Sequence, residues 1–213
     1  EHLVAVLRRD ARPLIHDGDL KIEDNHRREE YRAYFGRALG PHYLTRGIDA
    51  GYELLAELGA VNEQRVLTAL GRDLAKLPVD PKIGRMLLAA KAESCLSEML
   101  ILTAALSVQD PRERPQDKRE AALEKHRLFF EERSDFLTYL KIWNFFDDAI
   151  KHKKSNRKLI ELCHDNFLSH FRMREWREIH TQLHAQVIEM GLRLSDKPAT
   201  YEQIHRALLP GLL

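Results

Sequence analysis

The sequence MLILTAALSVQDPRERPQDK, residues 99–118, changes abruptly from apolar to charged. Its first part, MLILTAAL, is apolar almost all round, which predicts a helix buried at the centre of a helical core. The residues that follow carry Pro111 and Pro115 among charged side chains. Proline ends a helix and restricts the chain, so residues 107–118, here named the elbow, are expected to form a stiff polar segment.

Apolar residues recur at helical spacing on both sides of this stretch, and the alternation typical of strands is almost absent. Thr68 is expected to cap the helix that begins at Ala69, and Pro81 to occupy the first turn of the next one. The predicted fold class is therefore mainly α, with at most one small β-hairpin near residues 61–68. The predicted helices span 48–58, 69–77, 81–94, 95–108, 117–130, 135–150, 159–163 and 173–190.

The predicted helix over 117–130 begins at the end of the elbow and carries many opposite charges four residues apart. A surface helix of this kind turns its apolar side chains toward the core. The side chains predicted to face inward are Ala121, Leu123 and Leu128, with Phe129 or Phe130.

At 213 residues, with 44% hydrophobic and 31% charged residues, the chain has the composition of an ordinary soluble globular protein. No apolar run approaches the ~20 residues that a membrane span requires, and the N-terminal residues are too charged for a signal peptide. We therefore expect a cytoplasmic protein without a membrane partner. Cys95 and Cys163 lie in apolar helical surroundings with no CxxC pair, which is typical of buried, reduced thiols.

The formal net charge of +1 conceals an uneven distribution. Residues 151–180 contain eight Lys or Arg, four Asp or Glu and four His. Such a local excess attracts phosphates even when the whole molecule is near neutral. A solvated helix face has the same pattern, so the charge distribution alone leaves both interpretations open.

Motifs for autonomous catalysis are absent from the sequence. It has no G-x-x-x-x-G-K-[ST] loop for phosphates, no D-E-A-H motif for magnesium and no G-x-S-x-G motif of a nucleophilic serine. His180 and His184 have the spacing of metal ligands, but Thr181 stands where a zinc protease has its glutamate. The Cys-His-Asp trio at 163–165 is adjacent on a helix, so its side chains diverge. We expect no catalytic residue, metal or cofactor in this chain.

The elbow carries side chains suited to binding a nucleic-acid strand. Arg112 and Arg114 are permanently charged planar forks that match phosphate oxygens. Ser107 and Gln109 can donate hydrogen bonds to a phosphate or a base. The prolines stiffen the segment and so reduce the entropy lost on binding. Alternatively, the elbow is an exposed loop whose arginines pair with its own carboxylates, and the residues alone leave both interpretations open.

Several motifs resemble, in order and spacing, those of one family of RNA helicases. They are T-x-L-G-R-x-L-A-x-L-P-V-D-P at 68–81, G-R-M-L-L-A-A at 84–90, A-L-S-V-Q-D-P-R-E-R-P-x-D-K at 105–118, S-D-F-L at 134–137 and F-L-x-x-x-R-x-R-E-W-R-E-I at 167–179. The series is similar to the DEAH-box/RHA helicases, most of all to their bacterial HrpA-like branch. It covers residues 47–213, and it departs from the family at Ser169 and His170, where an Asn-Tyr pair is usual.

The resemblance implies a domain organisation. Residues 47–80 would be part of a winged helix, and residues 81–192 a helical ratchet, or helicase-associated, domain. Residues 193–213 would be a linker and the approach to an OB-fold region that the chain does not contain. Residues 1–46 do not resemble the usual opening of the winged helix and receive no assignment.

The resemblance also implies a function. In this family two RecA-like motor domains use ATP and Mg²⁺ to step along single-stranded RNA, while the ratchet domain closes the channel around the strand. We therefore expect an accessory module with no ATPase site of its own, belonging to a parent ATP-dependent RNA helicase. Its expected partners are single-stranded RNA or DNA, and the motor domains and OB-fold of the parent. The expected strand contacts are Ser107, Gln109, Arg112, Arg114, Lys118, Arg172 and Arg174.

A helical adaptor that docks a protein partner, or its own motor domains, is the alternative function. The two functions differ in what the elbow does. If the elbow displays its arginines toward a strand, reversing the charges of Arg112 and Arg114 together is expected to weaken RNA binding without changing the thermal midpoint.

Overall fold

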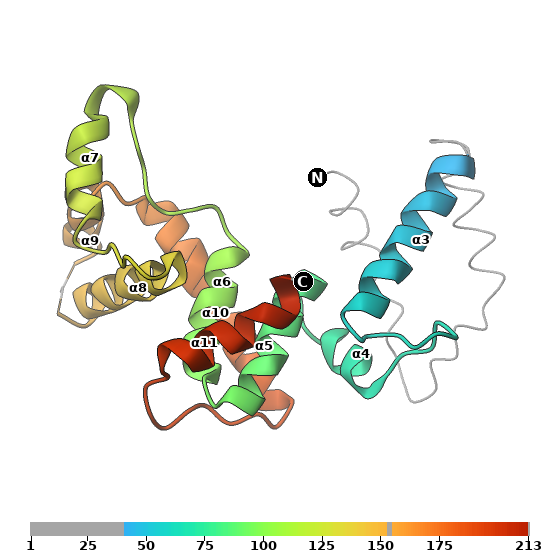
Figure 1. Cartoon of the computed structure of the whole chain (residues 1–213). Coiled ribbons are helices and arrows are strands. Elements are labelled where there is room, and N and C mark those ends of the chain that lie inside the picture. The colour runs from blue at the N-terminus through green and yellow to red at the C-terminus, as the bar shows by residue number, and fades with distance from the viewer. Residues whose placement is uncertain (1–40, 153–154, 213) are drawn as a thin grey trace.

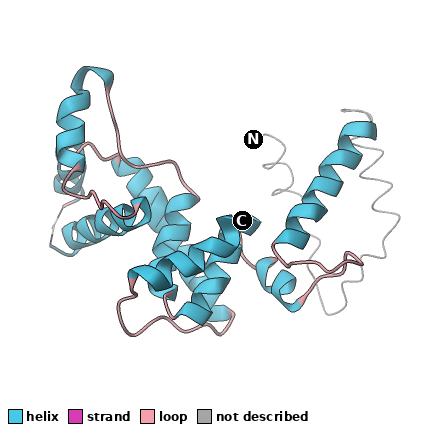
Figure 2. Cartoon of the chain, in the orientation of Figure 1, coloured by secondary structure: helices cyan, strands magenta, loops and turns pink. Residues whose placement is uncertain are grey.

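The computed structural model describes residues 41–152 and 155–212, with side chains from residue 47 onward. This part of the chain consists of helices joined by loops (Figures 1 and 2). The mainly α fold class is thereby confirmed, and residues 1–40 of the unassigned N-terminal segment lie outside the described part. The helices are α3 (Pro41–Glu57), α4 (Ala69–Leu74), α5 (Pro81–Glu93), α6 (Leu96–Leu106), the 3₁₀ helix η2 (Gln116–Lys118), α7 (Arg119–His126), α8 (Asp135–His152), α9 (Asn156–Asp165), α10 (His170–Glu189) and α11 (Tyr201–Leu212).

Strand-like pairing within the described residues is confined to two isolated antiparallel bridges. One joins Val61 to Leu67, where the small hairpin was predicted. The other joins Arg112 in the elbow to Leu168 in the loop before α10, and the sequence pattern did not predict it. The second bridge matters for function because it fixes the elbow against a segment more than fifty residues further along the chain.

Helix α6 forms the centre of the core, as its apolar sequence predicted. Leu96, Met99, Leu100 and Leu102 are each at most 1% exposed. The helix packs against α5, α8, α10 and α11. Burying an aliphatic side chain of this size stabilises a fold by ~1.5–3 kcal/mol, so α6 contributes much of the core's stability. Despite this apolar centre, no helix in the described part of the chain is long and apolar enough to cross a membrane.

The helices before and after residues 75–80 begin as predicted. The Thr68 hydroxyl accepts from the Gly71 N–H at 3.0 Å and caps α4. Pro81 opens α5, and the Asp80 carboxylate accepts from the Lys82 N–H at 2.9 Å. Gly71 leaves no room for a side chain, because a Cβ there would lie 1.9 Å from the Ala60 carbonyl oxygen. The glycine therefore allows α4 to approach the residues that follow α3.

The prediction for the helix over 117–130 is wrong in its length and in most of its inward face, and it is confirmed only at Phe129. The α-helix ends at His126, and η2 occupies residues 116–118. Ala122, His126 and Phe129 are buried, whereas Ala121 is exposed. Leu123, Leu128 and Phe130 are 44%, 68% and 59% exposed. The apolar pattern misplaced this face because a histidine, a polar residue by composition, is held inside by a tertiary hydrogen bond.

The segment after α10 is fixed to the core. The Ser195 hydroxyl accepts from the Leu96 N–H at 2.9 Å and so caps α6 from a distant part of the sequence. Helix α11 packs along α5 (Figure 1), with Ile204 and Leu208 at most 2% exposed. A Cβ at Gly211 would lie 2.2 Å from the Lys82 carbonyl oxygen, which shows how closely the two helices approach. The continuation into an OB-fold stays a prediction.

Candidate nucleic-acid interface

The elbow is held along its length by the loop that precedes α10. The Glu113 N–H donates to the Phe167 carbonyl at 2.8 Å, and the Ser169 N–H donates to the Pro111 carbonyl at 2.8 Å. These bonds form a short antiparallel pairing between the two segments. This backbone pairing adds a tertiary restraint to the two prolines from which a stiff elbow was predicted.

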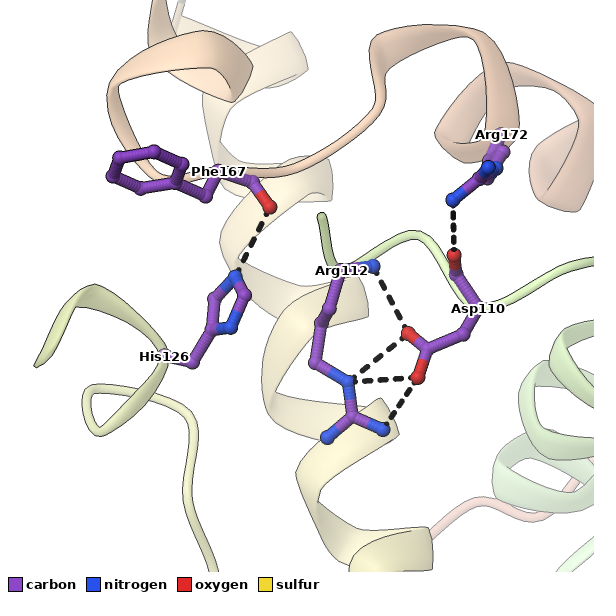
Figure 3. Close-up of polar contacts among 5 residues, drawn as sticks. All are labelled: Asp110, Arg112, His126, Phe167 and Arg172. Carbon is purple, nitrogen blue, oxygen red and sulfur yellow. Dashed lines mark hydrogen bonds and ion pairs between the residues drawn. The ribbon is translucent and has the colours of Figure 1, made fainter. Parts of the chain in front are cut away.

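Arg112 is an internal part of the elbow. Its Nε lies 3.0 and 3.1 Å from the two carboxylate oxygens of Asp110, and its Nη2 lies 2.8 Å from one of them (Figure 3). The Arg112 backbone N–H donates to the same carboxylate at 2.9 Å. The guanidinium lies 5.1 Å from the centre of the Tyr139 ring. The arginine side chain is only 13% exposed, so the expectation that Arg112 is displayed at the surface is wrong.

The pKa values of this pair reflect their mutual contact. Burial raises the pKa of Asp110, but hydrogen bonds from Arg112 and its positive charge outweigh burial, and the pKa lies below its ordinary value. The hydrogen bonds to Asp110 raise the pKa of Arg112, although burial opposes this. Burial also raises the pKa of the Tyr139 phenol. Both members of the pair are therefore ionised at neutral pH. Because Arg112 is paired inside the elbow, reversing the charges of Arg112 and Arg114 together is expected to lower the thermal midpoint as well as to weaken binding.

Arg172 also holds the elbow in place. Its Nη1 donates to the Asp110 backbone carbonyl at 2.9 Å, and its side chain is half-buried (Figure 3). Arg172 therefore connects the first turn of α10 to the elbow, while Arg112 connects the elbow to itself and to α8. Both guanidiniums are therefore already engaged by groups of the protein, and neither is available to bind a ligand without breaking these bonds.

Four of the predicted contacts are presented outward by the elbow. Gln109, Arg114 and Lys118 are exposed. Ser107 is also exposed, but its hydroxyl donates to the Thr103 carbonyl at 2.8 Å, which leaves the oxygen as a hydrogen-bond acceptor. The groups best placed to donate to an anion are therefore the guanidinium of Arg114, the ammonium of Lys118 and the amide of Gln109.

Arg174 lies apart from the elbow on the outer face of α10. It pairs with Glu178, one turn further on, at 3.4 Å, and both side chains are more than 60% exposed. An exposed pair of this spacing contributes only ~0.3–0.5 kcal/mol, so the arginine can exchange this partner for another anion. Arg112 and Arg172 are therefore partly buried and bonded to the elbow, whereas Arg114, Lys118 and Arg174 are exposed to solvent.

His126 and Phe167 were missed by sequence reasoning. His126 is 8% exposed, and its Nε2 lies 3.0 Å from the Phe167 carbonyl (Figure 3). A carbonyl only accepts, so Nε2 carries the proton and donates. Phe167 has a φ of 51°, a left-handed conformation that costs a non-glycine residue on the order of 1–3 kcal/mol. The burial of His126 has no local sequence signal, because it depends on a contact with a distant loop. The left-handed Phe167 belongs to the C-terminal cap of α9, where the Phe167 and Leu168 N–H groups donate to the His164 and Cys163 carbonyls.

The histidine pair at 180 and 184 and the Cys-His-Asp trio at 163–165 do not form a catalytic or metal site among the described residues. His180 lies 4.6 Å from the Trp143 ring, and burial, followed by the charge of His184, lowers the pKa of His180 to about 4. Cys163 is buried, and burial raises the pKa of its thiol to about 11, whereas the neighbouring His164 is exposed. Among the described residues, no group of three or more His, Cys, Asp or Glu is arranged to hold a metal ion.

Comparison with known proteins identifies two matched regions. Residues 52–79 match the winged-helix part of the helicase associated domain (HA2), and residues 80–139 match its ratchet-like part. The boundary between the two matches lies where the structure places the start of α5. The whole elbow lies within the ratchet-like match.

Three relatives extend the match beyond these regions. The ATP-dependent RNA helicase HrpA of Escherichia coli is 47% identical over 79% of this chain, and its Haemophilus influenzae homolog is 45% identical over 79%. The DExH-box ATP-dependent RNA helicase DExH1 of Arabidopsis thaliana is 34% identical over 80% of this chain. The aligned region makes up 13%, 13% and 17% of the length of these three relatives, so this chain spans a small part of each.

Proposed function

Residues 52–139 belong to the helicase-associated (HA2) winged-helix and ratchet-like family, and from this premise we propose that the chain is an accessory module that binds single-stranded RNA for a DEAH-box RNA helicase. The relatives are named as ATP-dependent RNA helicases, which supports RNA as the ligand. The observation that carries the proposal is the elbow. Its interior is fixed by Arg112 and Arg172, and its exposed side carries Gln109, Arg114 and Lys118.

The elbow suits a ligand that slides past it. A rigid support means that Arg114 and Lys118 lose little backbone entropy when they meet a phosphate. The charges of Arg114 and Lys118 can contact successive phosphates of a strand, and such contacts do not depend on the bases. Binding is therefore expected to be weak and largely independent of nucleotide sequence. DNA single strands present the same phosphates and are a second ligand of this surface.

ATP hydrolysis is assigned to motor domains outside this chain. The sequence has no glycine-rich phosphate loop with its lysine, so its own residues do not suit ATP or Mg²⁺. In this proposal the motor domains bind ATP and Mg²⁺ and move the strand. The present chain contributes the outer wall, and its partners are the motor domains and OB-fold of the parent helicase.

Neutralising the exposed charges of the elbow tests the proposal. The double variant R114Q/K118Q is expected to bind a single-stranded oligonucleotide about tenfold more weakly at low salt, because it loses two phosphate contacts. A plot of log affinity against log salt is expected to become shallower by about 1.4, or ~0.7 for each contact with a single strand. The thermal midpoint should stay the same, since both side chains are exposed.

The matched control removes the same charge from another surface. Lys91 on α5 and Arg206 on α11 are exposed, so K91Q/R206Q loses one lysine and one arginine without touching the elbow. Fluorescence anisotropy at several salt concentrations compares the two double variants. Equal affinities and equal salt slopes for the two would show that general charge, and not the elbow, attracts the strand.

A protein adaptor remains the second candidate function, and exposed apolar side chains favour it. Phe171, Leu128 and Phe130 are 75%, 68% and 59% exposed. Large apolar side chains on a surface are typical of sites that dock proteins when they are contiguous. A pull-down in high salt that retains a motor domain and no RNA would favour the adaptor, because salt weakens phosphate contacts and strengthens apolar ones.

A further inference from the structure

The Phe167 carbonyl receives hydrogen bonds from two different elements. The Glu113 N–H of the elbow donates to it at 2.8 Å, and the His126 imidazole at the end of α7 donates to it at 3.0 Å. Both donors meet a peptide whose own residue has a φ of 51°. The left-handed conformation itself ends α9, because the Phe167 N–H donates to the His164 carbonyl at 3.1 Å and the Leu168 N–H donates to the Cys163 carbonyl at 2.9 Å. The two donors to the Phe167 carbonyl therefore attach the end of α9 to the elbow and to α7.

The imidazole of His126 has one ring nitrogen in use and one without a partner. Nε2 donates to Phe167, whereas Nδ1 is buried and has no hydrogen-bond partner among the described residues. In the neutral imidazole Nδ1 is a bare acceptor, which is the less costly form to bury. Protonation would convert it into a buried N–H donor with no acceptor beside it.

The charges around His126 are mostly positive. The positive charges of Arg112 and Arg114 act on the ring, and the carboxylate of Asp110 opposes them. That carboxylate is already committed to Arg112 by three side-chain contacts of 2.8–3.1 Å. On α8 the Tyr139 ring lies 5.1 Å from the Arg112 guanidinium, and burial raises the pKa of its phenol, which is therefore neutral. A charged imidazole would therefore be repelled by two guanidiniums, and the one carboxylate that opposes them is already paired.

We propose that neutral His126 is a latch that closes α7 and the Phe167 loop onto the elbow, and that protonation of the imidazole at mildly acidic pH opens it. In the open state the ring is hydrated, the Phe167 carbonyl is released, and the Glu113 and Ser169 amides lose their partners. The elbow then keeps its internal Asp110–Arg112 pair but loses its support from the loop. This latch is independent of any bound strand, and its test uses the protein alone.

The direction of the pH dependence follows from the pKa shift. Burial lowers the pKa of His126, the hydrogen bond to Phe167 opposes this, and the positive charges of Arg112 and Arg114 lower the pKa further. The closed state therefore binds a proton less readily than the open state does. Closure is fully stable above the ordinary histidine pKa of about 6.5 and weakens as pH falls through the lowered pKa. Between these two values the equilibrium constant for opening rises about tenfold for each unit by which the pH falls.

Amide hydrogen exchange measured by NMR between about pH 7.5 and pH 5 tests the latch, with each rate converted to a protection factor that removes the intrinsic effect of pH. In the unmodified chain, the protection factors of the Glu113 and Ser169 amides are expected to fall as pH drops below ~6.5, at a slope of at most about tenfold per unit that ends at the lowered pKa of His126. The core amides of α6 serve as the internal reference and should not change. His180, with a pKa of about 4, stays neutral over this range.

Two variants separate the latch from other titrating groups. H126Q keeps a side-chain N–H donor but cannot be charged, so its protection factors at Glu113 and Ser169 should be independent of pH. H152Q removes an exposed histidine at the end of α8 and should retain the full pH dependence. An undiminished pH dependence in H126Q would overturn the proposal and assign the effect to another group, such as His170, whose pKa burial also lowers.

A direct titration keeps the test decisive even if H126Q folds poorly. The imidazole resonances of His126 in the unmodified chain should give a pKa below 6.5, and the amide resonances of Glu113 and Ser169 should shift with the same midpoint. A His126 pKa at or above that of free histidine, or amides that do not follow it, would also overturn the proposal.

Discussion

Replacing Trp176 by alanine is expected to lower the free energy of unfolding by about 4 kcal/mol. Trp176 lies on α10 and has no exposed surface. Its ring is 5.3 Å from Trp143 and 5.9 Å from Tyr139, and its Nε1–H donates to the Ile101 carbonyl at 2.8 Å. The alanine variant would leave a large cavity where α10 meets α6. Chemical denaturation followed by circular dichroism measures the loss.

Two further variants show what the tryptophan contributes. W176F keeps an aromatic ring and removes the N–H donor, so it should cost about 1–3 kcal/mol, less than W176A. F171A on the same helix removes a side chain that is 75% exposed and should change stability by less than about 0.5 kcal/mol. If W176A were no more harmful than F171A, α10 would not pack on α6 as described.

The second prediction concerns Arg112, where R112M is expected to lower the free energy of unfolding by about 2 kcal/mol. Removing one member of a buried ion pair leaves the other charge without a partner, which costs ~3–5 kcal/mol when both are fully buried. The Asp110 side chain is 36% exposed, so water compensates part of that cost. R114M changes an exposed arginine two residues further on and should change stability by less than about 0.5 kcal/mol.

The pH dependence of stability distinguishes the ion pair from simple loss of packing. The lowered pKa of Asp110 means that its carboxylate stabilises the fold at pH values above its ordinary pKa, and that this contribution is lost as pH falls through the lowered value. R112M should therefore lose less stability than the unmodified chain between neutral pH and about pH 3. The double variant D110N/R112M should recover part of the stability that R112M lost, because no unpaired charge remains. A double variant that simply adds the two single losses would argue against the pair.

Variants of Arg112 are expected to change both the structure of the elbow and its binding of a strand. A variant that reverses both Arg112 and Arg114 would weaken binding partly by distorting the elbow. Variants of Arg114 and Lys118 leave the interior of the elbow intact, so they report on the ligand alone. The structure thus changes which residues a mutational test should use.

Much of the fold could be predicted from the sequence because it depends on local patterns. The apolar run of α6 indicated a buried central helix, Thr68 indicated a cap, and Pro81 indicated the first turn of α5. These signals act over a few residues, and each was confirmed by the structure. The order and spacing of the motifs also indicated the helicase-associated family, which the matches over 52–139 confirmed.

What the sequence could not predict depends on contacts between distant segments. The inward face of α7 was misplaced because His126 is held by Phe167, a residue in another loop. The segment predicted as a linker after residue 193 is fixed because Ser195 caps α6. Neither contact can be predicted from the local pattern of apolar and polar residues, because each joins residues far apart in the sequence.

The sequence by itself determined that this chain is a helical member of the helicase-associated family, with a stiff charged elbow after a buried helix. Only the tertiary structure decided which charges of that elbow face inward and which face solvent. The physical reason is that helix periodicity and proline act within one segment, whereas the burial of an arginine depends on a carboxylate, an aromatic ring and a carbonyl that folding brings together. Arg112 and Arg114 stand two residues apart in the same polar sequence, and folding alone gives them different roles.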